Sequence, residues 1–247
     1  MMNYLNKKII IIDNSDLSYS GDDINGTILR GTEASLILLS EQFVRMGIDV
    51  DYCNTINTKK NINGVNYFNK NNIDKKIIYD LAIAVSDANE FNRVSSIKKA
   101  VFSNSNQPIE KFIRKKQLIP FLKYRPILIT LCDYQFKKRS FFTSFYGKKT
   151  IPITVDPMFL DIDVNDNFLP KRKVVYNIRS NRNLDQLIKI WCEKIFPTNN
   201  EFELYITPNL INYNDYHQKN NIFTRTIGSR SEMIDELKNY RALTYPG

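Results

Sequence analysis

The sequence predicts an α/β fold in which helices cover parallel β-sheets. Short apolar runs such as Lys8–Asp13 have the length and composition of strands that are buried on both faces. A helical pattern and a glycine follow this first run, and the same alternation returns after a polar, charged segment at 161–172. The chain has 247 residues, of which 43% are hydrophobic, so it can bury a sizeable core. We therefore expect two domains, residues 1–160 and residues 161–247.

The N-terminal segments form one predicted βαβ unit. A strand at Lys8–Asp13 is followed by a polar loop at Asn14–Arg30, a helix at about Thr32–Met46 and a strand at Ile48–Cys53. Gly47 lies where a helix often ends in the left-handed conformation. The apolar stripe of the helix consists of Leu36, Leu39, Phe43 and Met46. Strand, helix and strand in this order are typical of a parallel sheet.

The rest of the chain repeats this order. In the first domain, one helix is expected to begin near Pro108 and a basic helix to cover Tyr134–Phe145. Its further strands are expected at Asp80–Val85, Lys99–Ser103, Ile127–Leu131 and Thr150–Val155. In the second domain, a helix is expected at Leu184–Ile195, and a capping box at Ser229–Glu232 opens another. The strands of this domain are expected at Lys173–Ile178, Phe202–Thr207, Asn221–Thr224 and Arg241–Tyr245.

Composition argues against several classes of function. The three cysteines are widely separated, which argues against a disulfide framework or a zinc site and indicates a reducing, cytoplasmic compartment. His217 is the only histidine, so a metal cluster built on histidines is excluded, and its polar surroundings predict a solvent-facing loop. No run reaches the roughly 18 apolar residues of a membrane-spanning helix. The formal charge of +9 suits anionic ligands, but the lysines are scattered and no nucleic-acid motif accompanies them, so we expect no specific nucleic-acid binding.

The first candidate site is the helix start at Arg30–Glu33. A helix N-terminus after a strand offers free backbone N–H groups and a positive dipole end, and Gly31 would let a ligand approach the backbone. The long loop and the absence of a GxGxxG motif argue against a nicotinamide dehydrogenase. The alternative is structural: Gly31 shapes the turn, and Glu33 neutralises the helix dipole.

The second candidate site is the segment Ile178–Asp185, between a strand end and a helix start. Ligands bind at this place in open α/β sheets. Arg179 and Arg182 suit a diphosphate, because guanidinium groups form forked, charge-assisted hydrogen bonds to phosphate oxygens. The alternative is a solvated loop in which Arg182 pairs with Asp185.

Polar residues also follow the predicted fourth and fifth strands of the first domain. Because the carboxyl ends of parallel strands meet at one edge of the sheet, a cleft there would hold an acceptor. Polar residues at strand ends also occur without any function. The candidate acceptor residues are Asn104, Asn106, Asp133 and Tyr134.

These segments, in their order along the chain, resemble the GT4-like branch of GT-B glycosyltransferases. Arg30–Ser35 (RGTEAS) resembles the family's G-(G/T)-x-E helix start. Arg45–Val50 (RMGIDV) is similar to its (R/K)-x-G-H-x-V helix end, with Ile48 in place of the usual histidine. Leu131–Gln135 (LCDYQ) and the interdomain segment Ile151–Phe159 (IPITVDPMF) resemble two further motifs of the family.

The resemblance continues in the second domain. Ile178–Ile188 is similar to a G-R…K-G-l-d-x-L-i segment, in which Arg179 and Arg182 match the two basic residues of the donor diphosphate site. Asn221–Pro246 resembles the segment that ends in y-P-s. The family's acidic donor motif would follow that segment. The resemblance therefore implies Rossmann-like parallel sheets with flanking helices, in a GT-B arrangement with an incomplete second domain.

The implied activity is transfer of a sugar from a nucleotide-sugar donor to a saccharide or lipid-linked acceptor by a hexosyltransferase-like enzyme. No metal or cofactor is expected, and no catalytic residue is assigned. The implied donor-binding residues are Arg179, Arg182 and Asn183. The implied phosphate or acceptor loop consists of Gly31, Thr32 and Glu33.

Two alternatives stay open. A non-catalytic, truncated Rossmann-like binding or interaction module would also account for a second domain that stops early. The basic helix expected at Tyr134–Phe145 is either an ordinary amphipathic surface helix or a peripheral contact with the cytoplasmic face of an anionic membrane that carries a lipid-linked acceptor.

Overall fold

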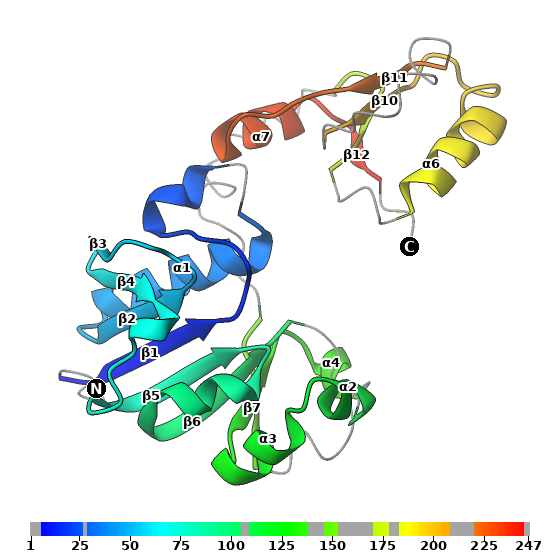
Figure 1. Ribbon diagram of the computed structural model, residues 1–247. Helices are drawn as coiled ribbons and strands as arrows, with labels where there is room; N and C mark the ends of the chain where they lie inside the picture. The colour runs from blue at the N-terminus through cyan, green and yellow to red at the C-terminus, as the bar shows by residue number, and fades with distance from the viewer. Residues whose placement is uncertain are drawn as a thin grey trace. The chain divides into compact units, whose positions relative to one another are not determined.

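The chain divides into two compact units, the first formed by residues 1–24 and 28–154 and the second by residues 25–27 and 155–247. A computed structural model describes residues 6–26, 29–104, 109–137, 146–152, 170–177, 183–207 and 220–244. Figure 1 shows the helices and strands of each unit. The expected α/β class is confirmed, because both units consist of a mainly parallel sheet with flanking helices.

The first unit contains an eight-stranded sheet in the order β3-β4-β2-β1-β5-β6-β7-β8. All neighbouring strands are parallel except β3 and β4, which form an antiparallel hairpin at the edge. The strands are β1 (Lys8–Asp13), β2 (Asp49–Asn54), β3 (Lys60–Ile62), β4 (Val65–Asn69), β5 (Ile78–Val85), β6 (Ser95–Ser103), β7 (Ile127–Thr130) and β8 (Lys148–Thr150).

Two hydrophobic cores lie on the two faces of this sheet. Side chains alternate across a strand, so β1 sends Ile9 and Ile11 into one core and Ile10 and Ile12 into the other. Helix α1 (Gly31–Arg45) covers the first face. The second face is covered by η3 (Ala88–Arg93), α2 (Ile109–Arg114) and α3 (Leu118–Tyr124). The expectation that β1 is buried on both faces is therefore confirmed.

Helix α1 agrees with the predicted helix to within one residue at each end. Leu36 is buried and Leu39 and Phe43 pack against the core, as expected, but Met46 is 50% exposed and does not belong to the apolar stripe. Met46 is the C-cap residue, so its side chain has already left the packed face. Gly47 has φ of 80°, which confirms the left-handed helix end.

Besides its short 3-10 helices, the first unit contains three elements that were not predicted from the sequence, namely β3, β4 and α3. The hairpin turns at Asn63 and Gly64, whose φ angles are 49° and 82°. Asn-Gly with two positive φ angles is the preferred pair of a tight hairpin turn. The expected strand at Thr150–Val155 was placed too late, because β8 ends at Thr150. The basic helix begins as α4 (Asp133–Lys137), and residues 138–145 lie outside the described part of the chain.

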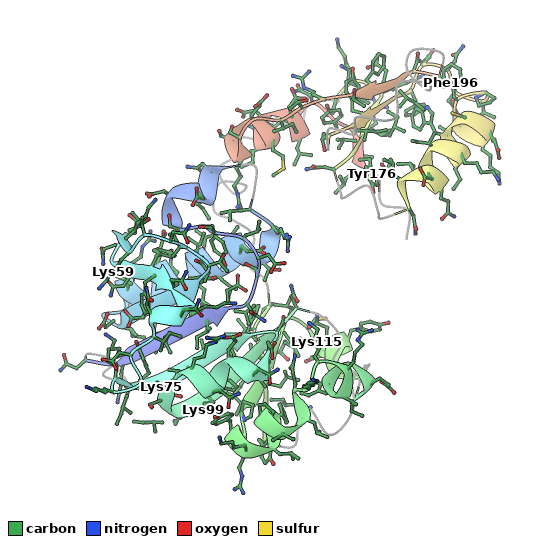
Figure 2. The ribbon with its side chains drawn as sticks, viewed as in Figure 1. Lys59, Lys75, Lys99, Lys115, Tyr176 and Phe196 are labelled. Carbon is green, nitrogen blue, oxygen red and sulfur yellow. The ribbon has the colours of Figure 1, made fainter. Side chains whose placement is uncertain are left out.

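The second unit has a parallel four-stranded sheet in the order β11-β10-β9-β12. Helix α6 (Leu184–Ile190) continues as a π-helical turn, η5 (Trp191–Ile195), and the fully buried Trp191 and Tyr176 lie in the same core. Tyr176 is labelled in Figure 2. In α7 (Arg230–Leu237), the Glu232 N–H donates to Ser229 Oγ at 3.1 Å, so the predicted cap is confirmed. The strands are β9 (Lys173–Tyr176), β10 (Glu203–Ile206), β11 (Ile222–Thr224) and β12 (Ala242–Leu243).

Each sheet has a point at which the order of its strands reverses. In the first sheet the chain passes from β1 to β2 on one side and later places β5 on the other side of β1. In the second sheet, β9 lies between β10 and β12 in the same way. Ligands of open α/β sheets bind beyond the carboxyl ends of the strands at such points. The two sheet edges that follow β1 and β9 are therefore the candidate sites for a ligand.

Candidate functional site

The carboxyl end of β1 carries a buried aspartate. Asp13, the last residue of β1, is only 4% exposed. One of its carboxylate oxygens accepts a hydrogen bond of 2.5 Å from the Tyr19 hydroxyl, and the other accepts from the Ser15 backbone N–H at 3.1 Å. A buried carboxylate is costly unless such bonds satisfy it. The aspartate therefore fixes the loop that leaves the strand.

Two buried tyrosines extend this network into β2. The hydroxyl oxygens of Tyr19 and Tyr52 lie 2.5 Å apart. Burial, together with the charge of Asp13, raises the pKa of both phenols well above the ordinary value, so both are neutral. Asn54 donates to the Tyr19 carbonyl at 2.7 Å. The network holds the β1–α1 loop against the sheet, and sequence reasoning missed it because its members are far apart in the chain.

Helix α1 begins with uncapped backbone N–H groups. Arg30 occupies the N-cap position, and its side chain makes no capping hydrogen bond. A Cβ atom added to Gly31 would meet nothing within 4 Å, so the space beside the first helical residue is open. The alternative in which Gly31 is needed for the turn is not supported, because its φ is not positive and no neighbour crowds it. Open N–H groups at a helix start suit an anionic or hydroxyl-bearing ligand.

Glu33 lies in the first turn of α1 and is nearly buried. Its side chain is 5% exposed, and Oε1 lies 3.7 Å from the Arg30 guanidinium. Oε2 has no hydrogen-bond partner among the described residues. A buried carboxylate oxygen without a partner is unusual, because desolvation then goes uncompensated. Glu33 therefore offers an acceptor that a donor group of a ligand can use.

The structure brings one candidate acceptor residue to this helix start. The amide nitrogen of Asn104, directly after β6, donates to Thr32 Oγ1 at 2.7 Å. Asp133 instead accepts a bond of 3.0 Å from Thr150, the last residue of β8. Tyr134 is 61% exposed. Asn106 lies outside the described residues, so its position stays a prediction.

A second polar group at the same edge was not predicted. Asn14 follows β1, Asp87 follows β5, and Lys70 follows β4. The Asn14 amide donates to Asp87 at 3.2 Å and accepts from the Lys70 ammonium at 2.5 Å. Each residue comes within two positions of a strand's carboxyl end, which was the sequence signal that could have found them.

In the second unit, the described carboxyl edge is also polar. Asn177 follows β9 and accepts a bond of 2.7 Å from Thr207, which follows β10. Asn183 has φ of 57° and is the N-cap residue of α6, and its carbonyl accepts from the Leu187 N–H. Arg179 and Arg182 lie between these residues, outside the described part of the chain. Their predicted roles on a donor diphosphate therefore stay predictions, as does the position of His217.

Positive charge is spread over the first unit. Figure 2 labels four lysines of this unit, of which Lys59 and Lys115 stand apart from Lys75 and Lys99. Among the described residues, no group of three or more His, Cys, Asp or Glu side chains is arranged to hold a metal ion. The described helices are also too short or too polar to cross a bilayer.

The fold is similar to that of solved glycosyltransferases. A structure described as the glycotransferase of kitacinnamycin shares 9% identity at a TM-score of 0.52, over 90% of this chain and 71% of that chain. An α-glucosyltransferase in complex with UDP and a 13-mer DNA containing a central A:G mismatch shares 10% identity at a TM-score of 0.53, over 98% of this chain and 71% of that chain. The chain has a GT-B-like fold. No protein-family model and no curated protein sequence matches it.

In this GT-B-like fold, each of the two units has a carboxyl edge of the kind at which ligands bind. The expected Rossmann-like parallel sheets are confirmed by the strand orders and by these two neighbours. At such low identity the likeness concerns the fold, so the residues that act on a ligand must be argued from this chain's own side chains.

Proposed function

We propose that the chain transfers a sugar from a nucleotide-sugar donor to a saccharide or lipid-linked acceptor, without a metal ion. The observation that carries this proposal is the GT-B-like fold, in which each of two Rossmann-like units has a polar carboxyl edge at its strand-reversal point. One of the similar structures contains UDP, a nucleoside diphosphate of the kind that such a donor would release.

The donor is proposed to bind the second unit. In the sequence, Arg179 and Arg182 fall between Asn177 and Asn183, which lie at the carboxyl edge after β9 and before α6. Two guanidinium groups would stabilise the negative charge that develops on the leaving diphosphate. In other enzymes a metal ion stabilises this charge. Asn183 is the N-cap residue of α6, so the backbone N–H groups of the first helical turn add to the same positive field.

The acceptor is proposed to bind the first unit at the start of α1. The open backbone beside Gly31 and the unpartnered oxygen of Glu33 provide a donor and an acceptor for sugar hydroxyl groups. Asn104 holds Thr32 from the end of β6. Amide and carboxylate groups of this kind recognise hydroxyl-rich ligands, because a hydroxyl both donates and accepts.

Calorimetry with free nucleoside diphosphates tests the donor half of the proposal. The wild-type chain is titrated with UDP, GDP and ADP, and the best ligand is repeated on the Arg179→Gln/Arg182→Gln variant. Removing two charge-assisted contacts is expected to weaken binding by about 100-fold. Arg172→Gln is the matched control, because Arg172 lies at the amino-terminal edge of the same sheet and pairs with Glu201. Unchanged affinity in the double variant would overturn the donor assignment.

The alternative, a non-catalytic binding or interaction module, predicts a different pattern. Such a module retains the fold and can retain nucleotide binding, but it releases no diphosphate from any nucleotide sugar. Because one similar structure contains a DNA duplex, a mismatched duplex is included among the acceptors offered. Transfer to that duplex alone would replace the saccharide or lipid-linked acceptor in the proposal.

A further inference from the structure

A pocket of about 260 Å³ opens on the side of the second sheet that carries α7. Lys173 of β9, Tyr205 of β10, Arg225 after β11 and Glu236 of α7 contribute to its walls. We call it the α7 pocket. Lys173 begins β9, whereas the polar carboxyl edge at Asn177 lies four residues further along, about 13 Å at the rise of a strand. The pocket is thus distinct from the proposed donor site.

The acidic groups of the α7 pocket are already engaged. Glu236 forms an ion pair with Arg225, and its Oε2 accepts a bond of 3.1 Å from the Tyr240 hydroxyl. Glu203 is not one of the residues that line the pocket. Its carboxylate accepts a hydrogen bond of 2.8 Å from the Tyr205 hydroxyl and lies 3.5 Å from the Lys173 ammonium. Neither carboxylate is therefore left to attract a cationic ligand.

The cationic groups, in contrast, keep unused hydrogen-bond donors. Lys171 is exposed and forms no ion pair with any residue that the structure describes. The Lys173 ammonium donates to Tyr205 at 3.0 Å, and that bond raises the pKa of Lys173, so the group is a cation at neutral pH. Arg225 is 47% exposed and carries five N–H donors, of which Glu236 cannot use all. The three cations and the two carboxylates together leave a net charge of +1, so the pocket favours an anion.

Aromatic rings form the apolar part of the wall. Tyr205 and Tyr240 meet edge to face with ring centroids 5.3 Å apart, and Phe223 stacks on Tyr205 at 5.1 Å. The volume is below the range of about 300–1,000 Å³ of pockets for drug-sized ligands. A ligand of this pocket therefore has room for about one ring beside its charged group.

We infer that the α7 pocket binds a small phosphate ester with a single ring, its phosphate held by Lys171, Lys173 and Arg225 and its ring against Tyr205 and Tyr240. A phosphate ester has three charged oxygens, one for each of the three cationic groups, whereas a carboxylate has two. This site is separate from the donor and acceptor edges, and it does not depend on whether the chain transfers a sugar.

Phenyl phosphate is the probe, titrated calorimetrically into the full chain at low salt, with inorganic phosphate and benzoate as comparisons. Phenyl phosphate is expected to bind saturably and more tightly than either, because inorganic phosphate has no ring and benzoate offers two charged oxygens instead of three. Lys171→Gln is expected to weaken it about tenfold, the effect of losing one charged hydrogen bond. Lys171 is exposed, so this change leaves the fold intact.

Lys189→Gln is the matched control, since Lys189 is an exposed lysine of α6 in the same unit and does not line the pocket. It is expected to leave the affinity unchanged. Equal weakening by both variants, no weakening by Lys171→Gln, or no saturable binding would each overturn the inference. So would binding that survives Lys171→Gln but is lost in Arg179→Gln/Arg182→Gln, because the phosphate would then lie at the donor edge.

Discussion

The hydroxyl of Tyr19 donates a 2.5 Å hydrogen bond to the carboxylate of Asp13 and thereby fastens the β1–α1 loop to the end of β1. The same hydroxyl lies 2.5 Å from that of Tyr52 on the neighbouring strand. The loop leads to the open N-terminus of α1, so the geometry of the proposed acceptor site depends on this buried network.

Tyr19→Phe is expected to destabilise the protein. The change removes the shared hydroxyl and leaves the buried Asp13 with one bonding partner fewer, which costs about 1–3 kcal/mol. Urea unfolding followed by circular dichroism measures the difference. Tyr124→Phe is the control, because the Tyr124 hydroxyl bonds Asn92 at the exposed surface. An equal, small effect of both changes would contradict the structural role of the network.

Gly64→Ala is expected to destabilise the β3–β4 hairpin. Gly64 has φ of 82°, and an added Cβ would lie 2.6 Å from Cγ1 of Val44 on α1. Left-handed strain and this close contact together cost about 1–3 kcal/mol. The free energy of unfolding is again the measurement, and a loss smaller than about 0.5 kcal/mol would show that the turn can relax.

Gly31→Ala separates function from stability. No atom lies within 4 Å of the added Cβ, and alanine is the better helix residue, so stability is expected to stay equal or to rise. If the acceptor approaches the backbone here, the methyl group occupies its space, and KM for the acceptor rises while the free energy of unfolding does not fall. An unchanged KM would place the acceptor elsewhere.

The Asp80 carboxylate predicts an acid-sensitive contribution to stability. Hydrogen bonds from the Lys7 ammonium at 2.8 Å and from the Lys8 backbone N–H at 2.9 Å lower the pKa of Asp80. A lowered pKa in the folded state stabilises the protein above the unfolded value of about 4 and loses this effect as pH falls through the folded value. Asp80→Asn should therefore destabilise at pH 7 and become equal to the wild type at low pH. Asp16→Asn, at an exposed aspartate, controls for the loss of one charge, and a difference for Asp80→Asn that persists at low pH would contradict the prediction.

The three free cysteines are expected to react with a thiol reagent in the order of their exposure. Cys132 is exposed, Cys192 is half-buried and Cys53 is fully buried in β2. Burial also raises the pKa of the Cys53 thiol, which reduces the reactive thiolate further. Iodoacetamide labelling followed by peptide mass spectrometry should modify Cys132 first and Cys53 only on unfolding. Early labelling of Cys53 would contradict the packing of β2.

Local patterns were enough to predict β1 and α1. The run of four isoleucines is typical of a strand buried on both faces, and Gly47 marks the helix end. The hairpin escaped prediction because β3 is three residues long and polar, although Asn63-Gly64 carries the turn signal. Helix α3 was missed because it is short and contains Pro120, which is tolerated only in a first turn.

The site was less predictable than the fold. The helix start at Gly31 and the strand end at Asn104 could be read from spacing, but their meeting depends on β6 lying two strands from β1. The burial of Glu33 and the Asn14–Asp87 bond likewise arise from tertiary packing. Short-range sequence patterns place polar groups at the carboxyl ends of strands, but they do not give the strand order that decides which of these groups meet.

Donor turnover is the most direct measure of the central proposal. The full chain is incubated with a panel of nucleotide sugars and with saccharide and lipid-linked acceptors, and the release of nucleoside diphosphate is followed by chromatography. We expect release from one donor that requires an acceptor, persists in the presence of a metal chelator, and is lost in Arg179→Gln/Arg182→Gln but not in Arg172→Gln. Nucleotide binding without release from any donor would contradict sugar transfer and leave a binding module.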